Sequence, residues 1–143
     1  MPVITLKRVA GQFGFDAADE LGHIIPIDAS PEMGGNNYGA RPMQLLLMGL
    51  GGCSGIDILN ILRKQKQEVQ HFEMRIEGGR EPGKEPSVWA NVKLVFELTG
   101  AIDPAKAQRA VDLSMDKYCS VAETLRRAGG NLTWEVVVKD PAP

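Results

Sequence analysis

The first 28 residues alternate short apolar runs with polar turns. The apolar runs are Val3–Val9, Phe13–Phe15 and Ile24–Ile27. Gly11 and the polar segment 19–22 separate them. Runs of this length between turn residues predict a strand followed by a hairpin. A stretch rich in glycine, asparagine and proline follows from Ala29 to Arg41, and this composition predicts a loop.

The next segment is apolar on almost every side of a helix. Pro42 suits a first helical turn, where its missing N–H costs nothing, and the helical pattern runs from Met43 to about Gln65. A helix that is hydrophobic all round is a central, buried one. Its four glycines each cost roughly 0.8–1 kcal/mol of helix propensity relative to alanine. We expect the close approach of another helix or another subunit to compensate, or else a break in the helix. These glycines are Gly49, Gly51, Gly52 and Gly55.

The second half predicts two strands, two helices and a final strand. Period-two alternation over residues 72–77 and 88–98, with a turn at 78–83 between them, is typical of antiparallel strands with one wet face. Asp103-Pro104 predicts the start of a helix that runs to about Lys117. A shorter helix over 120–128 and a strand over 132–139 complete the chain. This order predicts an α+β fold, with antiparallel sheets packed around the long central buried helix.

Length and charge narrow the functional classes. The 143 residues are most simply one domain, residues 1–143. A net charge of −2, with no long block of like charge, argues against nucleic acid or a membrane surface as the partner. The apolar segment contains Gln44, Asp57 and Asn60, which argues against a membrane span. No secretion signal is visible at the N-terminus, so we expect a cytoplasmic protein.

Two cysteines are the main candidates for chemistry. Cys53 lies among small residues in the central helix, and Cys119 opens the second short helix. At a helix N-terminus the dipole is expected to lower the pKa of the Cys119 thiol. Asp57, one turn after Cys53, would oppose a thiolate if it faced the sulfur. In the cytoplasm a disulfide between these cysteines would be catalytic or redox-sensing. They are thus either a redox couple or two inert buried thiols.

Other kinds of site find little support. His23 and His71 are the only histidines, and neither has a partner at metal-ligand spacing. We therefore expect no metal, no other cofactor and no Cys–His hydrolase dyad. The Gly34-Gly35-Asn36-Asn37 segment lacks the Lys-Ser/Thr ending of a phosphate-binding loop, and an ordinary loop is the better interpretation.

The residues around both cysteines, Gly39 to Asp57 and Asp116 to Leu125, resemble the OsmC/Ohr family of osmotically induced and organic-hydroperoxide-resistance proteins. The resemblance implies an intertwined homodimer with its sites at the interface. It also implies thiol peroxidase chemistry, in which Cys53 reduces an organic hydroperoxide and becomes a sulfenic acid. Cys119 then condenses with it to a disulfide, which an external dithiol reduces.

Two family positions differ in this sequence. Active members place a Glu directly after the Pro that opens the central helix, and here that residue is Met43. They also place an Arg in the N-terminal hairpin, near the turn that corresponds to residues 10–13, and no Arg occurs in that turn. We expect Arg41 or Arg8 to stabilise the thiolate in its place, with Gln44 as a supporting residue.

The differences are typical of a less characterised OsmC-like branch, and they leave three hypotheses. The first is a cytosolic, dimeric thiol peroxidase acting through Cys53 and Cys119. The second is a dimer of the same shape that has lost turnover and binds a small hydrophobic or thiol-reactive ligand. The third is a purely structural or stress-associated dimer.

Overall fold

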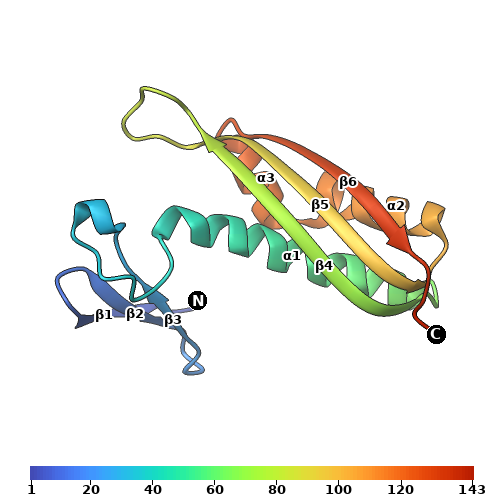
Figure 1. The fold of residues 1–143 in the computed structure, drawn as a ribbon, viewed down its shortest axis with the longest axis horizontal. Helices are drawn as coiled ribbons and strands as arrows, with labels where there is room; N and C mark the ends of the chain where they lie inside the picture. The colour runs from blue at the N-terminus through green and yellow to red at the C-terminus, as the bar shows by residue number, and fades with distance from the viewer. The chain divides into compact units, whose positions relative to one another are not determined.

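The computed structural model describes all residues from 1 to 143 (Figure 1). The strands and helices follow the expected order, and the fold is α+β. By its contacts the chain divides into two compact units, Met1–Leu46 and Leu47–Pro143. The elements are β1 (Thr5–Ala10), β2 (Gly14–Ala18), β3 (Ile24–Ile27), the short 3₁₀ turn η1 (Pro31–Met33), α1 (Pro42–Lys64), β4 (Glu68–Arg80), β5 (Trp89–Ala101), α2 (Pro104–Leu113), the π turn η2 (Ser114–Tyr118), α3 (Ser120–Arg127) and β6 (Asn131–Lys139).

The first unit contains a three-stranded antiparallel sheet in the order β1-β2-β3. The predicted strands and hairpin are confirmed. Among residues 1–46 only Gly14 and Asp28 are buried, so this sheet has no apolar core in the single chain. Its exposed apolar side chains include Leu6, Val9, Ile24 and Ile25, each more than half exposed.

The loop from Ala29 to Arg41 is organised around the buried carboxylate of Asp28. The backbone N–H groups of Ala29, Asn36 and Tyr38 donate to it at 2.7, 2.9 and 3.1 Å. The pKa of Asp28 is lowered, chiefly by the Asn36 N–H, against the opposing effect of burial. The glycine- and asparagine-rich loop thus directs its N–H groups at the chain's own carboxylate. Sequence reasoning did not single out Asp28.

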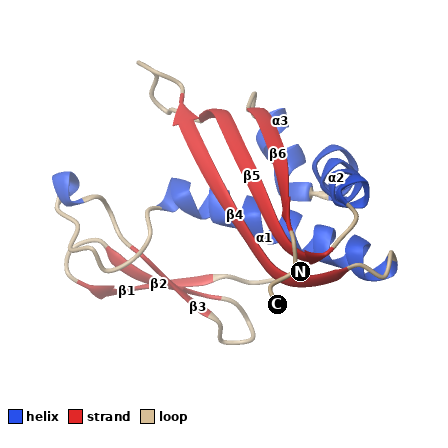
Figure 2. Ribbon diagram, turned by 45° about the vertical axis from the view of Figure 1, so that its right-hand side comes forward, coloured by secondary structure: helices blue, strands red, loops and turns tan.

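The second unit contains a mixed sheet in the order β4-β5-β6 (Figure 2). β4 pairs antiparallel to β5, as predicted, but β6 pairs parallel to β5, which corrects the expectation of purely antiparallel sheets. The reason is the connection: α2, η2 and α3 lie between β5 and β6, and a crossover of that length returns the chain to the beginning of its neighbour.

β4 is longer than predicted and includes Gly78 and Gly79, where we expected a turn. Gly78 pairs with Val92, and Gly79 pairs with Asn91. A Cβ at position 78 would lie 2.8 Å from the ring of Trp89, so a glycine fits this point of close approach. The strand therefore continues through the pair, and the turn begins after Arg80.

The core of the second unit lies between one face of the sheet and the helices. Leu94, Phe96 and Leu98 of β5 are fully buried, as are Ile58 and Leu62 of α1. α1 is also long and apolar enough, by length and composition alone, to cross a membrane. The core helix of a soluble protein meets the same criterion.

α1 is buried on one side only, which corrects the expectation of a helix buried all round. Met48 is 56% exposed, Ile56 71% and Leu59 43%. A helix in the middle of a fold needs partners on every side. Within one chain, α1 has a sheet on one side and an apolar surface open to solvent on another.

The four glycines of α1 divide between these two sides, and the helix is unbroken. A Cβ on Gly55 would lie 2.6 Å from Met74 Cε, and one on Gly51 would lie 3.0 Å from Ile76 Cδ1. The approaching partner is therefore strand β4, where another helix or another subunit was expected. Gly49 and Gly52 meet nothing within 4 Å.

Candidate active site at the two cysteines

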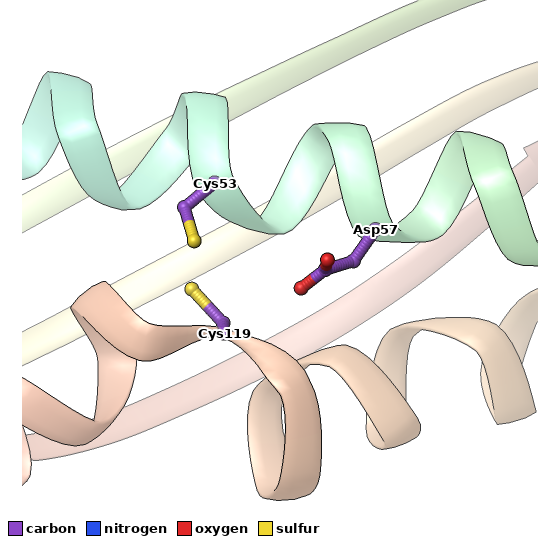
Figure 3. Close-up of side chains that lie close together, drawn as sticks. All are labelled: Cys53, Asp57 and Cys119. Carbon is purple, nitrogen blue, oxygen red and sulfur yellow. The ribbon is translucent and has the colours of Figure 1, made fainter.

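Cys53 and Cys119 face one another within the second unit (Figure 3). Cys53 lies in α1, and Cys119 lies between η2 and α3. Their sulfurs and a carboxylate oxygen of Asp57 all lie within 4.8 Å of one another, and both cysteines are free thiols. The fold thus brings together two cysteines far apart in sequence. Asp57 also faces the two sulfurs, an orientation that the sequence alone could not predict.

The surroundings of Cys119 favour a protonated thiol. Its side chain is 3% exposed, and its Sγ accepts a hydrogen bond from the Ala122 N–H at 3.4 Å. Burial raises the pKa of Cys119 to about 11; the Ala122 N–H opposes the rise, and the neighbouring Cys53 adds to it. The expectation of a lowered pKa at this helix N-terminus was therefore wrong, because loss of solvation outweighs the backbone N–H groups.

The buried hydroxyl of Ser114 holds Asp57 in place. Ser114 Oγ donates to Asp57 Oδ2 at 3.0 Å and lies 3.4 Å from the carbonyl oxygen of Ser54. These contacts join η2 to α1 directly beside the cysteines. Sequence analysis missed this residue, because it treated 103–117 as one regular helix, whereas α2 ends at Leu113 and a π turn follows.

Two shallow depressions open beside the cluster. One, of about 260 Å³, is adjacent to Cys119. The other, of about 350 Å³, is adjacent to Asp57. The first is lined by Lys117, Tyr118, Cys119, Ser120, Glu123, Thr124 and Arg127, and the second by Ile56, Asp57, Leu59, Asn60 and Arg63. Cys119 thus borders one depression and Asp57 the other.

The other candidate residues belong to the first unit. Arg8 is an exposed residue of β1, Arg41 is exposed just before α1, and Gln44 is exposed in the first turn of α1. The Gln44 N–H donates to the Arg41 carbonyl at 3.0 Å, which helps start the helix. The suggested roles of all three toward Cys53 stay predictions.

Comparison with known proteins agrees with the resemblance seen in the sequence. The family described as OsmC-like protein matches residues 34–135, which include both cysteines and Asp57. The chain belongs to the OsmC family. Protein YhfA of Escherichia coli K12 is 38% identical over 108 residues, covering 75% of this chain and 77% of YhfA.

Solved structures share the OsmC fold over nearly the whole chain. A hypothetical protein from Aquifex aeolicus superimposes with a TM-score of 0.85 at 27% identity, covering 99% of this chain and 98% of that one. An organic hydroperoxide resistance protein from Legionella pneumophila superimposes with a TM-score of 0.66 at 20% identity, covering 97% and 96%. At that identity the Legionella protein shows the fold alone.

Proposed function

We propose that this OsmC-family protein is a thiol-dependent peroxidase that reduces organic hydroperoxides through Cys53 and Cys119. The observation that supports it most directly is the placement of the two free sulfurs on facing elements, within 4.8 Å of one another. To form a disulfide, the two sulfurs must close from this separation to about 2.05 Å. An inert pair of buried thiols has no need of this arrangement.

The chemistry proceeds in three balanced steps. The Cys53 thiolate attacks the peroxide O–O bond, so that Cys53 becomes a sulfenic acid and the alkoxide takes a proton and leaves as the alcohol. Cys119 then attacks the Cys53 sulfur, which forms the disulfide and releases water. An external dithiol finally returns both cysteines to thiols by exchange and is itself oxidised to a disulfide.

The difference in exposure supports separate roles for the two cysteines. Cys53 is partly exposed, whereas Cys119 is buried and, with its raised pKa, is a thiol at neutral pH. Because the thiolate is the nucleophile, the accessible Cys53 suits the attack on peroxide, and Cys119 suits the second step. We propose Arg41 or Arg8 as the cation that stabilises the Cys53 thiolate, with Gln44 in support. The name of the Legionella relative agrees with a hydroperoxide substrate.

The same proposal includes a cytoplasmic homodimer in which residues 1–143 form one OsmC-like domain. The sheet of the first unit has no buried apolar side chain, and α1 exposes Met48 and Ile56. Gly49 and Gly52 leave open space beside the exposed side of α1. A second copy of the chain would cover these apolar surfaces, as the family resemblance implies.

One observation favours the alternative of a dimer that binds a small hydrophobic or thiol-reactive ligand without turnover. The Asp57 carboxylate lies beside both sulfurs, a polar group that the redox couple does not use. On this alternative the thiols will have ordinary reactivity and will not form a disulfide under mild oxidation.

Peroxide consumption under steady-state conditions separates these functions. The reduced protein is supplied with cumene hydroperoxide and excess dithiol, and residual peroxide is measured over time for the wild type, Cys53→Ser and Cys119→Ser. We expect Cys53→Ser to abolish turnover and Cys119→Ser to impair it, while Lys106→Ala, an exposed residue of α2 outside the site, retains it. Equal consumption by wild type and Cys53→Ser would reject the peroxidase.

A further inference from the structure

The three side chains at the cysteine site form a donor set suited to a metal ion. Cys53 and Cys119 supply two sulfurs and Asp57 one oxygen, all within 4.8 Å of one another. Tetrahedral Zn²⁺ with Zn–S bonds of about 2.3 Å requires its sulfurs to lie about 3.8 Å apart. The two sulfurs therefore need to close by about 1 Å or less, and each sulfur–oxygen pair by about 1.3 Å or less, because Zn–O bonds are about 2.0 Å long. Side-chain rotation alone supplies a movement of that size.

Neighbouring groups hold two of the three donors in position. Ser114 Oγ donates to Asp57 Oδ2 at 3.0 Å, and the Ala122 N–H donates to Cys119 Sγ at 3.4 Å. Ser114 is itself fully buried. Hydrogen bonds of this kind orient metal ligands and are a regular part of metal sites.

The charge at the site also suits a cation. None of the salt bridges in the structure involves Asp57, although seven other ion pairs form elsewhere. Its carboxylate has the Ser114 hydroxyl as a hydrogen-bond donor but no ion-pair partner. Two thiols and a carboxylate thus face one another, and a divalent cation would compensate the negative charge that they carry when ionised.

We propose that the reduced protein binds one thiophilic divalent cation, Zn²⁺ as the first choice, through Cys53, Cys119 and Asp57. Three protein ligands leave the fourth tetrahedral position to water or a small exogenous ligand. The depression of about 350 Å³ that Asp57 lines lies on the carboxylate side of this donor set. Histidine spacing led us to expect no metal, but this donor set contains no histidine, and both histidines instead pair with nearby acidic residues.

Metal binding and disulfide formation exclude one another at this site. A disulfide uses both sulfurs, so oxidation must release the ion. In that reaction the two thiolates give two electrons to the peroxide O–O bond, two protons are taken up, and the products are the disulfide, an alcohol, water and free Zn²⁺. This coupling rests on the proposed peroxidase, whereas the metal site stands without it.

The test is zinc binding by the reduced, metal-free protein under anaerobic conditions, in competition with a chromogenic chelator. We expect one Zn²⁺ per chain, with affinity lowered roughly 100-fold or more in each of Cys53→Ser, Cys119→Ser and Asp57→Asn, because loss of a direct ligand costs more than loss of an outer-shell partner. Asp116→Asn, an exposed carboxylate in the π turn, is the matched control and should bind like the wild type. Circular dichroism establishes that each variant is folded.

Cobalt provides an independent readout. Co²⁺ bound by the wild type should give a near-ultraviolet thiolate-to-cobalt charge-transfer band that weakens in each cysteine variant. Absence of stoichiometric binding, or binding that survives loss of either cysteine, would overturn the proposal. Unchanged affinity in Asp57→Asn would overturn the three-ligand site. No peroxide enters these measurements, so a failed peroxidase assay leaves their outcome unaffected.

Discussion

The backbone N–H of Cys119 donates to the carbonyl oxygen of Ser114 at 2.7 Å and closes a π turn. In a regular α-helix, two residues five positions apart lie about 140° apart around the axis. The wider turn brings them to the same side, so Ser114 contacts Asp57 while Cys119 faces Cys53. π turns within helices are frequent at functional sites.

Replacement of Ser114 by alanine tests whether its hydrogen bond to Asp57 stabilises the fold. The variant loses the hydroxyl that joins η2 to Asp57, and we expect the free energy of unfolding to fall by about 1 kcal/mol. Chemical denaturation of the reduced protein measures the loss. Ser120→Ala removes an exposed hydroxyl of α3 and serves as the control. Equal stability of the two variants would show that the Ser114 contact contributes nothing.

Cys119 should react with alkylating reagents much more slowly than Cys53 at neutral pH. Its pKa is raised to about 11 by burial, and only the thiolate reacts. Mass spectrometry of peptides after brief iodoacetamide treatment, repeated across pH, measures both sites. The label on Cys119 should increase steeply toward pH 11. Equal labelling of both cysteines at pH 7 would contradict the assignment of roles.

The same raised pKa has a consequence for stability. The folded state holds the Cys119 proton more tightly than the unfolded chain, whose ordinary thiol pKa is 9.0. Its contribution is therefore fully present below pH 9 and is lost as pH rises toward 11. Thermal unfolding of the reduced wild type should show a steeper loss over this range than Cys119→Ser does. Parallel curves would count against a buried, protonated thiol.

Asp28 should stabilise the N-terminal loop above acidic pH. Its pKa is lowered from 3.8, so its contribution is present above that value and is lost as pH falls through the folded-state pKa. We expect Asp28→Asn to melt at a lower temperature at pH 7 and to lose less stability in acid than the wild type. Asp140→Asn, at the exposed C-terminus, is the control. The prediction fails if both variants behave alike.

The variant Gly52→Ala tests whether the chain is a monomer or forms the proposed dimer through α1. The added Cβ meets nothing within 4 Å in the single chain, so it should gain roughly 0.8–1 kcal/mol of helix propensity. In a dimer formed through this side of α1, the same Cβ would lie in the interface and weaken association. Sedimentation equilibrium should therefore show a weaker dimer, with exposed Lys106→Ala of α2 unchanged. A monomeric wild type, or an unweakened dimer, would contradict this interface.

Local patterns in the sequence predicted the elements well because their signals lie in neighbouring residues. Asp103 and Pro104 begin α2 as expected, and the Asp103 carboxylate accepts the Ala105 N–H at 2.9 Å. Alternation likewise predicted β5. The direction of β6 was missed, because strand pairing depends on the crossover and not on the strand's own pattern. The extension of β4 through Gly78 depends on Trp89, a contact across strands.

The candidate site was only partly predictable. Both cysteines stand out from composition and context, but their proximity depends on packing between α1 and η2. Ser114 gave no signal, because the hydrophobic period does not distinguish a π turn from an α-helix. The direction of the shift in the Cys119 pKa was missed for a similar reason. The helix-dipole effect, worth about 0.3–1 kcal/mol, can be predicted from the sequence, whereas the burial of the thiol depends on the fold.

The most direct test of the redox couple is the intact mass and thiol count of the reduced protein after about one equivalent of cumene hydroperoxide. We predict rapid loss of both thiols, with a mass two hydrogens lighter. Cys119→Ser should instead gain one oxygen, as a sulfenic acid on Cys53. Two thiols that still titrate after long exposure, with no change in mass, would contradict the account.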